Sequence, residues 1–273
     1  MAQSALINVM LSAAHRAARN LTRDFGEVEQ LQVSRKGPAD FVSKADKKAE
    51  ETLHYELERA RPGWGFLMEE GGKIAADEGF EARWIIDPLD GTTNFLHGLP
   101  HFAISIAAEI HGKIEAAVIY DPIRDEAFTA EVGRGAFMGE RRLRVSSRTN
   151  PQDCLLATGI PWVGRGDKEL FQGEMDLFMD KVAGIRRYGS AALDLAYVAA
   201  GRFDGFWEHD LKIWDIAAGV LIVREAGGMV TECEGGSGML TSGSIMAGNS
   251  DIHSFMDGQL RPYYREFKKA KKA

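Results

Sequence analysis

The feature that most constrains the fold of this chain is an apolar run that ends in two carboxylates, Trp84-Ile85-Ile86-Asp87-Pro88-Leu89-Asp90. Such a run is typical of a short buried strand, and packing alone does not require two acids where a buried strand ends. Carboxylate oxygens are suitable ligands for a hard cation such as Mg²⁺. Gly91, the next residue, allows backbone N–H groups to approach an anion closely. The stretch therefore predicts a site for cations and phosphate.

Length and charge limit the class of protein. The 273 residues, of which 45% are apolar and 27% charged, suit one large globular domain or two subdomains. A net charge of −7 argues against a surface built to bind nucleic acid. The basic cluster at 268–272 is interpreted as a solvated tail, with an anchoring function as the alternative. Cys154 and Cys233 do not make a disulfide framework, so we expect reduced, buried thiols.

The sequence also predicts where the protein resides. No signal peptide is expected, because residues 1–21 alternate apolar and polar side chains at helical spacing. No apolar run approaches the roughly 18 residues of a membrane span, so we expect no membrane insertion. The cytoplasm is the expected location.

The hydrophobic pattern differs between the two halves of the chain. In the first half it predicts helices at 6–21 and 43–59, the second opening with a capping box from Ser43 to Asp46, and a strand at 65–68. A mostly antiparallel sheet is then expected from strands at 102–107, 114–119, 126–131 and 135–138.

After residue 150 strands and helices alternate. Strands are expected at 155–158, 185–188, 205–208, 229–231 and 245–247, and helices at 168–182, 191–200, 215–226 and after Ser250. The pattern predicts an α+β/α/β layered sandwich in which helix and sheet layers alternate. We expect a single globular unit over 1–273, with an α+β subdomain at about 1–148 and an α/β subdomain at about 149–273.

Acidic residues stand at the ends of several predicted elements: Asp46, Glu69-Glu70, Asp87 with Asp90, and Asp215. Open sheets place ligand sites at the carboxyl ends of their strands. Two anions about 4 Å apart repel by about 4 kcal/mol at an effective dielectric of 20, so converging acids need cations or raised pKa values. The histidines show no ligand spacing, because Pro100 separates His97 from His101. Mg²⁺ is therefore the expected ion.

These motifs resemble those of the inositol monophosphatase family, and the resemblance extends over nearly the whole chain. It is carried by Asp87–Thr92, Trp214–Gly219 and the acid pair Glu69-Glu70, with support from Gly189–Asp194 and Gly205–Glu208. The chain is most similar to the bacterial inositol-1-monophosphatases. The fold that the resemblance implies is the sugar-phosphatase-like layered sandwich.

The resemblance implies two to three Mg²⁺ ions. Glu69, Asp87 and the carbonyl of Leu89 would hold one ion. Asp87, Asp90 and Asp215 would hold a second, and a third would lie near Glu69, mostly among water molecules.

The resemblance also implies catalytic and substrate-binding residues. Thr92, paired with Asp46, would position and deprotonate the attacking water, while Glu69 and Glu70 would support catalysis. The amides of Gly91 and Thr92 would face the phosphate from a helix start. The expected substrate contacts are Asp90, Gly91, Thr92, Arg186, Ser190, Ala191, Glu208 and Asp215, with Arg187 as an alternative to Arg186.

Some of these residues also have purely structural interpretations. Asp46 can complete a helix cap, Glu70 can be a solvated neighbour, and Glu208 can be a surface charge. The family usually carries a hydroxyl residue after the acid pair, whereas this chain has Gly71, which removes a possible supporting hydrogen bond from the first metal site.

The function that the resemblance implies is Mg²⁺-dependent hydrolysis of a small polyol phosphate, with myo-inositol monophosphate preferred and inhibition by lithium. A metal-activated water would attack phosphorus in line, and a second metal would stabilise the leaving alcohol. Alternative substrates are histidinol phosphate, fructose 1,6-bisphosphate and a nucleotide phosphate, although residues 94–100 favour the inositol phosphatases. The resemblance also implies a homodimer, and a protein partner in the transcription machinery is the alternative from another class.

Overall fold

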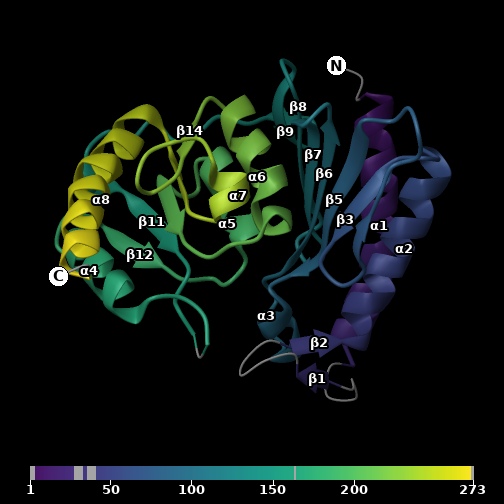
Figure 1. Ribbon diagram of the computed structural model, residues 1–273, viewed down its shortest axis with the longest axis horizontal. Helices are drawn as coiled ribbons and strands as arrows, with labels where there is room; N and C mark the ends of the chain where they lie inside the picture. Colours follow the sequence, from purple (N-terminus) through teal and green to yellow (C-terminus); the bar gives the residue numbers. More distant parts are fainter. Residues whose placement is uncertain (1–3, 28–32, 36–40, 163, 272–273) are drawn as a thin grey trace.

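The computed structural model describes residues 4–27, 33–35, 41–162 and 164–271. Two sheets alternate with three layers of helices, so the expected layered sandwich is confirmed (Figure 1). In order across the molecule, the helix pairs are α1 (Ala5–Phe25) with α2 (Lys44–Ala60), α5 (Ala191–Ala199) with α6 (Ile213–Glu225), and α4 (Lys168–Phe178) with α8 (Ser250–Ala270).

The first sheet has eight strands from one continuous part of the chain: β3 (Gly65–Met68), β4 (Gly72–Ile74), β5 (Ala82–Asp90), β6 (Ala103–Ile110), β7 (Lys113–Asp121), β8 (Glu126–Glu131), β9 (Gly135–Met138) and β10 (Arg141–Arg142). Their order is β10-β9-β8-β7-β6-β5-β3-β4, and only β3 with β5 is a parallel pair. Alternating side chains bury both faces, so Trp84 packs toward α1 and α2 while Ile85 packs toward α5 and α6.

Strand β5 is longer than the apolar run predicted. It continues through Asp87 to Asp90, with an irregular register against β6 between these two acids. Pro88 has no N–H to donate to the ladder, which explains why regular pairing is interrupted there. The acids therefore lie on the bulged end of a strand rather than in a loop after it.

The second sheet has five strands: β11 (Leu155–Thr158), β12 (Gly184–Arg186), β13 (Gly205–Glu208), β14 (Met229–Thr231) and β15 (Ile245–Gly248). Their order is β12-β11-β13-β15-β14, with β11 parallel to both of its neighbours. Helices α4 and α8 cover its outer face through Phe178, Ile252 and Leu260. Cys154 and Cys233 are buried and free, as expected.

Several boundaries differ from the predicted ones. Helix α4 ends at Phe178 rather than at residue 182, because the chain turns and the Ala183 N–H bonds the Cys154 carbonyl beside β11. Helix α6 starts two residues earlier than predicted, at Ile213. The predicted capping box at Ser43 depends on a side chain outside the described residues.

The remaining short elements are β1 (Val33–Arg35), β2 (Phe41–Ser43), α3 (Thr92–Leu96), a 3₁₀ turn (Pro151–Asp153) and α7 (Met239–Ser242). Strands β1 and β2 pair antiparallel as a separate two-stranded sheet. None of the helices in the described part of the chain combines the length and the apolar character that crossing a membrane requires.

Close packing of α5 on α6 yields a stability prediction. A Cβ at Gly219 would lie 2.6 Å from Leu195 Cβ, so we expect Gly219→Ala to destabilise the protein by about 1–3 kcal/mol through overpacking. The matched control is Gly258→Ala on α8, where a Cβ meets nothing within 4 Å and helix propensity adds about 0.5–1 kcal/mol of stability. Urea unfolding measures both changes, and a more stable Gly219→Ala protein would contradict the packing argument.

Candidate active site

A cavity of about 250 Å³ collects acidic residues from both sheets. Its walls come from the end of β5, the start of α3, the connections after β11 and β12, and the segment from β13 to α6. The predicted site residues that line it are Glu69, Asp87, Leu89, Asp90, Gly91, Thr92, Ser190, Ala191, Glu208 and Asp215. Asp46, Glu70 and Arg186 lie outside this lining.

Asp90 connects the two halves of the cavity. Its carboxylate accepts a hydrogen bond from the Ser190 hydroxyl at 2.5 Å and another from the Ala192 amide at 2.8 Å, at the start of α5. Burial raises the pKa of Asp90 to about 6, although these hydrogen bonds oppose the shift. Ser190 is itself buried and caps α5, so it positions Asp90 as well as lining the cavity.

Asp87 is held by its own strand. Its carboxylate accepts the Leu89 amide at 2.9 Å, which closes the turn around Pro88. Burial and the nearby charges of Glu69 and Asp90 raise the pKa of Asp87 well above its ordinary range. The carboxyl is therefore destabilised as an anion until positive charge enters the cavity.

Asp215 lies in the first turn of α6 and accepts the Lys212 amide at 2.7 Å. Burial and the charge of Asp90 raise its pKa to about 7, against the opposing effect of that amide and of Arg165. The Arg165 guanidinium lies 4.0 Å from the Asp215 carboxylate. Asp215 thus has a helix-capping contact on one side and faces the cavity on the other.

Glu208, the last residue of β13, is a half-buried acid that lines the cavity. A Cβ at Gly159 would lie 2.0 Å from the Glu208 carboxyl carbon, so glycine at this position leaves room for this side chain. Burial of the carboxyl group, followed by the charges of Asp215 and Asp90, raises the pKa of Glu208 to about 8. Glu208 is therefore a cavity residue and not a fully exposed surface charge.

The acid pair after β3 forms a group of its own with Asp46 of α2. One carboxylate oxygen from each of Asp46, Glu69 and Glu70 lies within 4.8 Å of the others, so this group can hold a metal ion. Glu50, one turn further along α2, accepts the Glu70 amide at 2.9 Å. A Cβ at Gly71 would lie 3.0 Å from the Glu50 carboxylate, so glycine at this position leaves room for Glu50 beside the turn.

The start of α3 shapes the phosphate side of the cavity. Gly91 has φ of 96°, and a Cβ there would lie 3.0 Å from the His101 carbonyl, so no other residue is accommodated without strain. The Thr92 hydroxyl donates to the Leu89 carbonyl at 2.9 Å. Its pairing with Asp46 stays a prediction.

Of the two arginines considered as substrate contacts, Arg187 and not Arg186 lines the cavity. Arg186 is the last residue of β12, and its guanidinium donates to the Ile185 carbonyl. The cavity therefore favours Arg187, the alternative, and the contact with substrate stays a prediction. Arg187 opposes the raised pKa of Glu208, as its position in the cavity requires.

Arg165 is a cavity residue that the sequence did not predict. Its guanidinium stacks over the Trp162 ring at 4.5 Å and donates to the Asp210 carbonyl. Gly164 and Gly166 on either side have φ of 85° and 82°. An arginine between two glycines was the one sequence feature that could have indicated Arg165 as a site residue. Its position near Asp215 follows only from the folded loop.

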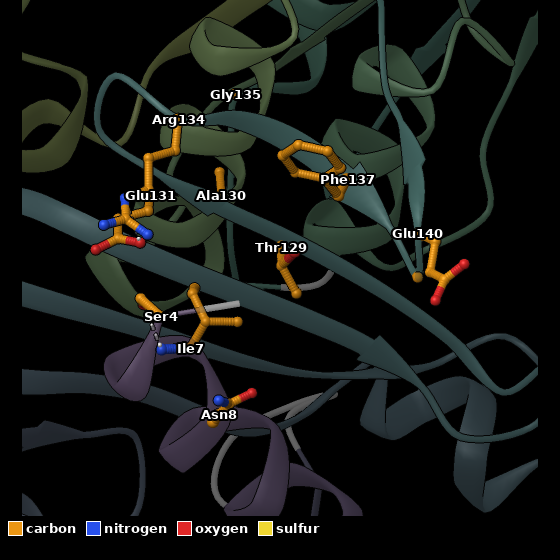
Figure 2. Close-up of a pocket in the computed structure, with 11 residues that line it drawn as sticks. Ser4, Ile7, Asn8, Thr129, Ala130, Glu131, Arg134, Gly135, Phe137 and Glu140 are labelled. Carbon is orange, nitrogen blue, oxygen red and sulfur yellow. Dashed lines mark hydrogen bonds and ion pairs between the residues drawn. The ribbon is translucent and has the colours of Figure 1, made fainter. Parts of the chain in front are cut away.

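A larger cavity, with a volume of about 1050 Å³, lies elsewhere (Figure 2). Figure 2 shows Ser4, the N-cap of α1, and Ile7 and Asn8 of α1 facing residues of β8 and β9 across it. Its Arg134 lies 3.3 Å from Glu131, so these charges offset each other. It shares no lining residue with the acidic cavity, which is the candidate site because its chemistry, rather than its volume, is distinctive.

The raised pKa values predict that metal-free protein loses stability between about pH 5 and about pH 8. The folded pKa values of Asp90, Asp215 and Glu208 are about 6, 7 and 8, against about 4 in an unfolded chain. The folded state therefore binds more protons, and this stability is fully present below the unfolded value and lost as pH rises through the folded values. Urea unfolding in EDTA should show a smaller loss for Asp90→Asn, which cannot titrate; an identical pH profile would contradict the prediction.

Comparisons with known proteins agree with the motifs. A family model described as the inositol monophosphatase family matches residues 2–266. The Inositol-1-monophosphatase of Mesorhizobium japonicum is 58% identical over 92% of this chain and 94% of that protein, and the Nus factor SuhB of Pseudomonas aeruginosa is 44% identical over 94% and 96%. The crystal structure of extragenic suppressor protein suhB from Bartonella henselae matches with a TM-score of 0.92 at 56% identity, over 94% of this chain and 99% of that one. This chain belongs to the inositol monophosphatase family, as its sequence predicted.

Proposed function

We propose that the protein removes phosphate from a small polyol in a Mg²⁺-dependent reaction, with myo-inositol monophosphate as the preferred substrate. The observation that carries the proposal is the cavity in which Glu69, Asp87, Asp90 and Asp215 meet the start of α3. Acids alone would repel a phosphate, so their convergence favours cations between them and the substrate. The relatives named Inositol-1-monophosphatase confirm the broader expectation of a phosphoric monoester hydrolase.

The donor atoms of the cavity fit hard divalent cations. Among the described residues that line it, none is a histidine or a cysteine, and the side-chain donors toward a metal are oxygens of carboxylates, hydroxyls and the Asn94 amide. On this proposal Glu69, Asp87 and the Leu89 carbonyl hold one Mg²⁺, while Asp87, Asp90 and Asp215 hold another. The group of Asp46, Glu69 and Glu70 supports a third ion at the edge. Inhibition by lithium belongs to the same proposal.

The protein groups then have distinct tasks. When bound, Mg²⁺ supplies charge neutralisation and Lewis acidity. The Thr92 hydroxyl donates a hydrogen bond to the Leu89 carbonyl, so the Thr92 oxygen is left to accept a hydrogen bond from the attacking water. Asp46 is the proposed partner of Thr92 in positioning and deprotonating that water. Amides at the start of α3 bind the phosphate, and Glu208 accepts hydrogen bonds from the hydroxyls of the polyol.

A panel of phosphomonoesters with and without EDTA tests the proposal. We expect myo-inositol monophosphate to be hydrolysed fastest, with activity lost in EDTA and restored by Mg²⁺, because the acids need positive charge before they can receive a phosphate. A rate of phosphate release that is the same with and without EDTA would contradict the metal mechanism. A large preference for histidinol phosphate, fructose 1,6-bisphosphate or a nucleotide would overturn the substrate and leave the mechanism in place.

Asp90→Asn is the informative variant for the same assay. It keeps the size of a residue that bonds Ser190 and Ala192 but removes one charge. We expect activity to fall by at least about 10–100-fold, the loss typical even of residues that only support metal ligands. Asp251→Asn, at an exposed position on α8, is the matched control and should keep full activity. Near-normal turnover of Asp90→Asn would remove Asp90 from the site.

A second candidate function is a protein partner of the transcription machinery, which the relative named Nus factor SuhB favours. If binding uses the outer surface and not the cavity, Asp90→Asn should co-purify with RNA polymerase as well as the unchanged chain does. Absence of polymerase from both purifications would contradict this function, and loss only with Asp90→Asn would contradict its separation from the cavity. The homodimer and the cytoplasmic location stay predictions.

A further inference from the structure

A buried carboxylate outside the acidic cavity binds donors from separate elements. Glu174 of α4 is fully buried. It accepts hydrogen bonds from Trp207 Nε1 at 3.1 Å, from His209 Nε2 at 2.7 Å and from the Tyr264 hydroxyl of α8. A buried carboxylate is costly without donors, so these four residues, here called the Glu174 network, hold one another in place.

The Glu174 network includes the residues directly before and after Glu208, which are Trp207 and His209. Trp207 is in β13 and His209 directly follows that strand, so the two residues flank Glu208. Both bond Glu174, and Glu208 between them lines the acidic cavity. The orientation of Glu208 therefore depends on the residues before and after it.

Glu208 stands between two spaces. It lines the acidic cavity beside Gly159, where a Cβ would collide with its carboxyl group. It also lines an adjoining pocket of about 170 Å³, whose walls include Glu174 and His209 and which shares Gly159 with the acidic cavity. If the network were broken, this pocket would give the Glu208 side chain room to turn away from the cavity.

We propose that the Glu174 network keeps Glu208 in the cavity and thereby favours substrates whose alcohol carries several hydroxyl groups. A carboxylate held in place can accept hydrogen bonds from neighbouring hydroxyls through both of its oxygens. The network residues act through Glu208, so they are positioning residues. The inference rests on the proposed function, because Glu208 has this role only when the ester binds in this cavity.

The test compares Tyr264→Phe with Tyr263→Phe, a neighbouring tyrosine on the same helix that lies outside the network. The substrates are myo-inositol 1-phosphate and phenyl phosphate, whose alcohol has no further hydroxyl. For Tyr264→Phe we expect KM for the inositol ester to rise about fivefold to tenfold with little change in kcat, the effect of weakening a hydrogen bond to a charged group. KM for phenyl phosphate, and both values for Tyr263→Phe, should change by less than about twofold.

A double-mutant cycle separates positioning from a general structural effect. In a Glu208→Ala background, Tyr264→Phe should not raise KM any further, because the residue through which the network acts is gone. Thermal unfolding shows whether each variant is folded. If Tyr264→Phe does not fold, His209→Ala replaces it, because the His209 side chain is 23% exposed. The same rise in KM for the inositol ester is expected for His209→Ala.

Three outcomes overturn the inference alone: equal KM increases for both esters, a Tyr264→Phe effect that persists in the Glu208→Ala background, or an unchanged KM in a folded Tyr264→Phe protein. If the protein without substitutions hydrolyses neither ester, both the proposed function and this inference are overturned.

Discussion

The carboxylate of Asp90 is the contact on which the rest of the structure depends. It is an acid of the first sheet, yet its hydrogen bonds come from Ser190 and the Ala192 amide at the start of α5, beside the second sheet. Asn94 makes a similar connection four residues later, since its side-chain amide donates to the His101 and Tyr188 carbonyls at 2.8 Å. The bonds from Ser190 and Ala192 to Asp90, and from Asn94 to Tyr188, each span roughly a hundred residues of chain and fix the two walls of the cavity relative to each other.

This arrangement works against the stability of the empty site. Asp87, Asp90, Asp215 and Glu208 lie around one cavity, and burial raises the pKa values of all four. Repulsion by neighbouring carboxylates adds to the rise for Asp87, Asp215 and Glu208. An assembly of this kind gains stability when cations enter, so binding and folding are linked. Arg165 and Arg187 offset part of the repulsion around Glu208, which explains why a cavity rich in acids also carries two arginines.

Local patterns predicted most of the fold, because alternation, helical periodicity and the acidic motifs act within short stretches of chain. The layers and most strands follow from them, and the acids at 69, 87, 90 and 215 do line one cavity. The differences arise where tertiary contacts decide. Strand β5 pairs with β6 again at Asp90, after the irregularity around Pro88, so it is longer than its apolar run. The path of the chain after β12 places Arg187 and not Arg186 in the cavity. The loop after β11 brings Arg165 to Asp215. A short sequence pattern does not predict which wall of a cavity a loop will form.

The acids proposed to hold metal and the acid proposed to bind the polyol come from different parts of the fold. Glu69 follows β3, and Asp87 and Asp90 end β5, in the first sheet, whereas Glu208 ends a strand of the second sheet. Trp207 and His209, on either side of Glu208, bond Glu174 in the outer helix layer, which also accepts a hydrogen bond from Tyr264. If Glu208 binds the polyol as proposed, substitutions in α4 and α8 can alter the alcohol preference without changing the acids proposed to bind metal, because function depends on particular side chains rather than on the fold as a whole.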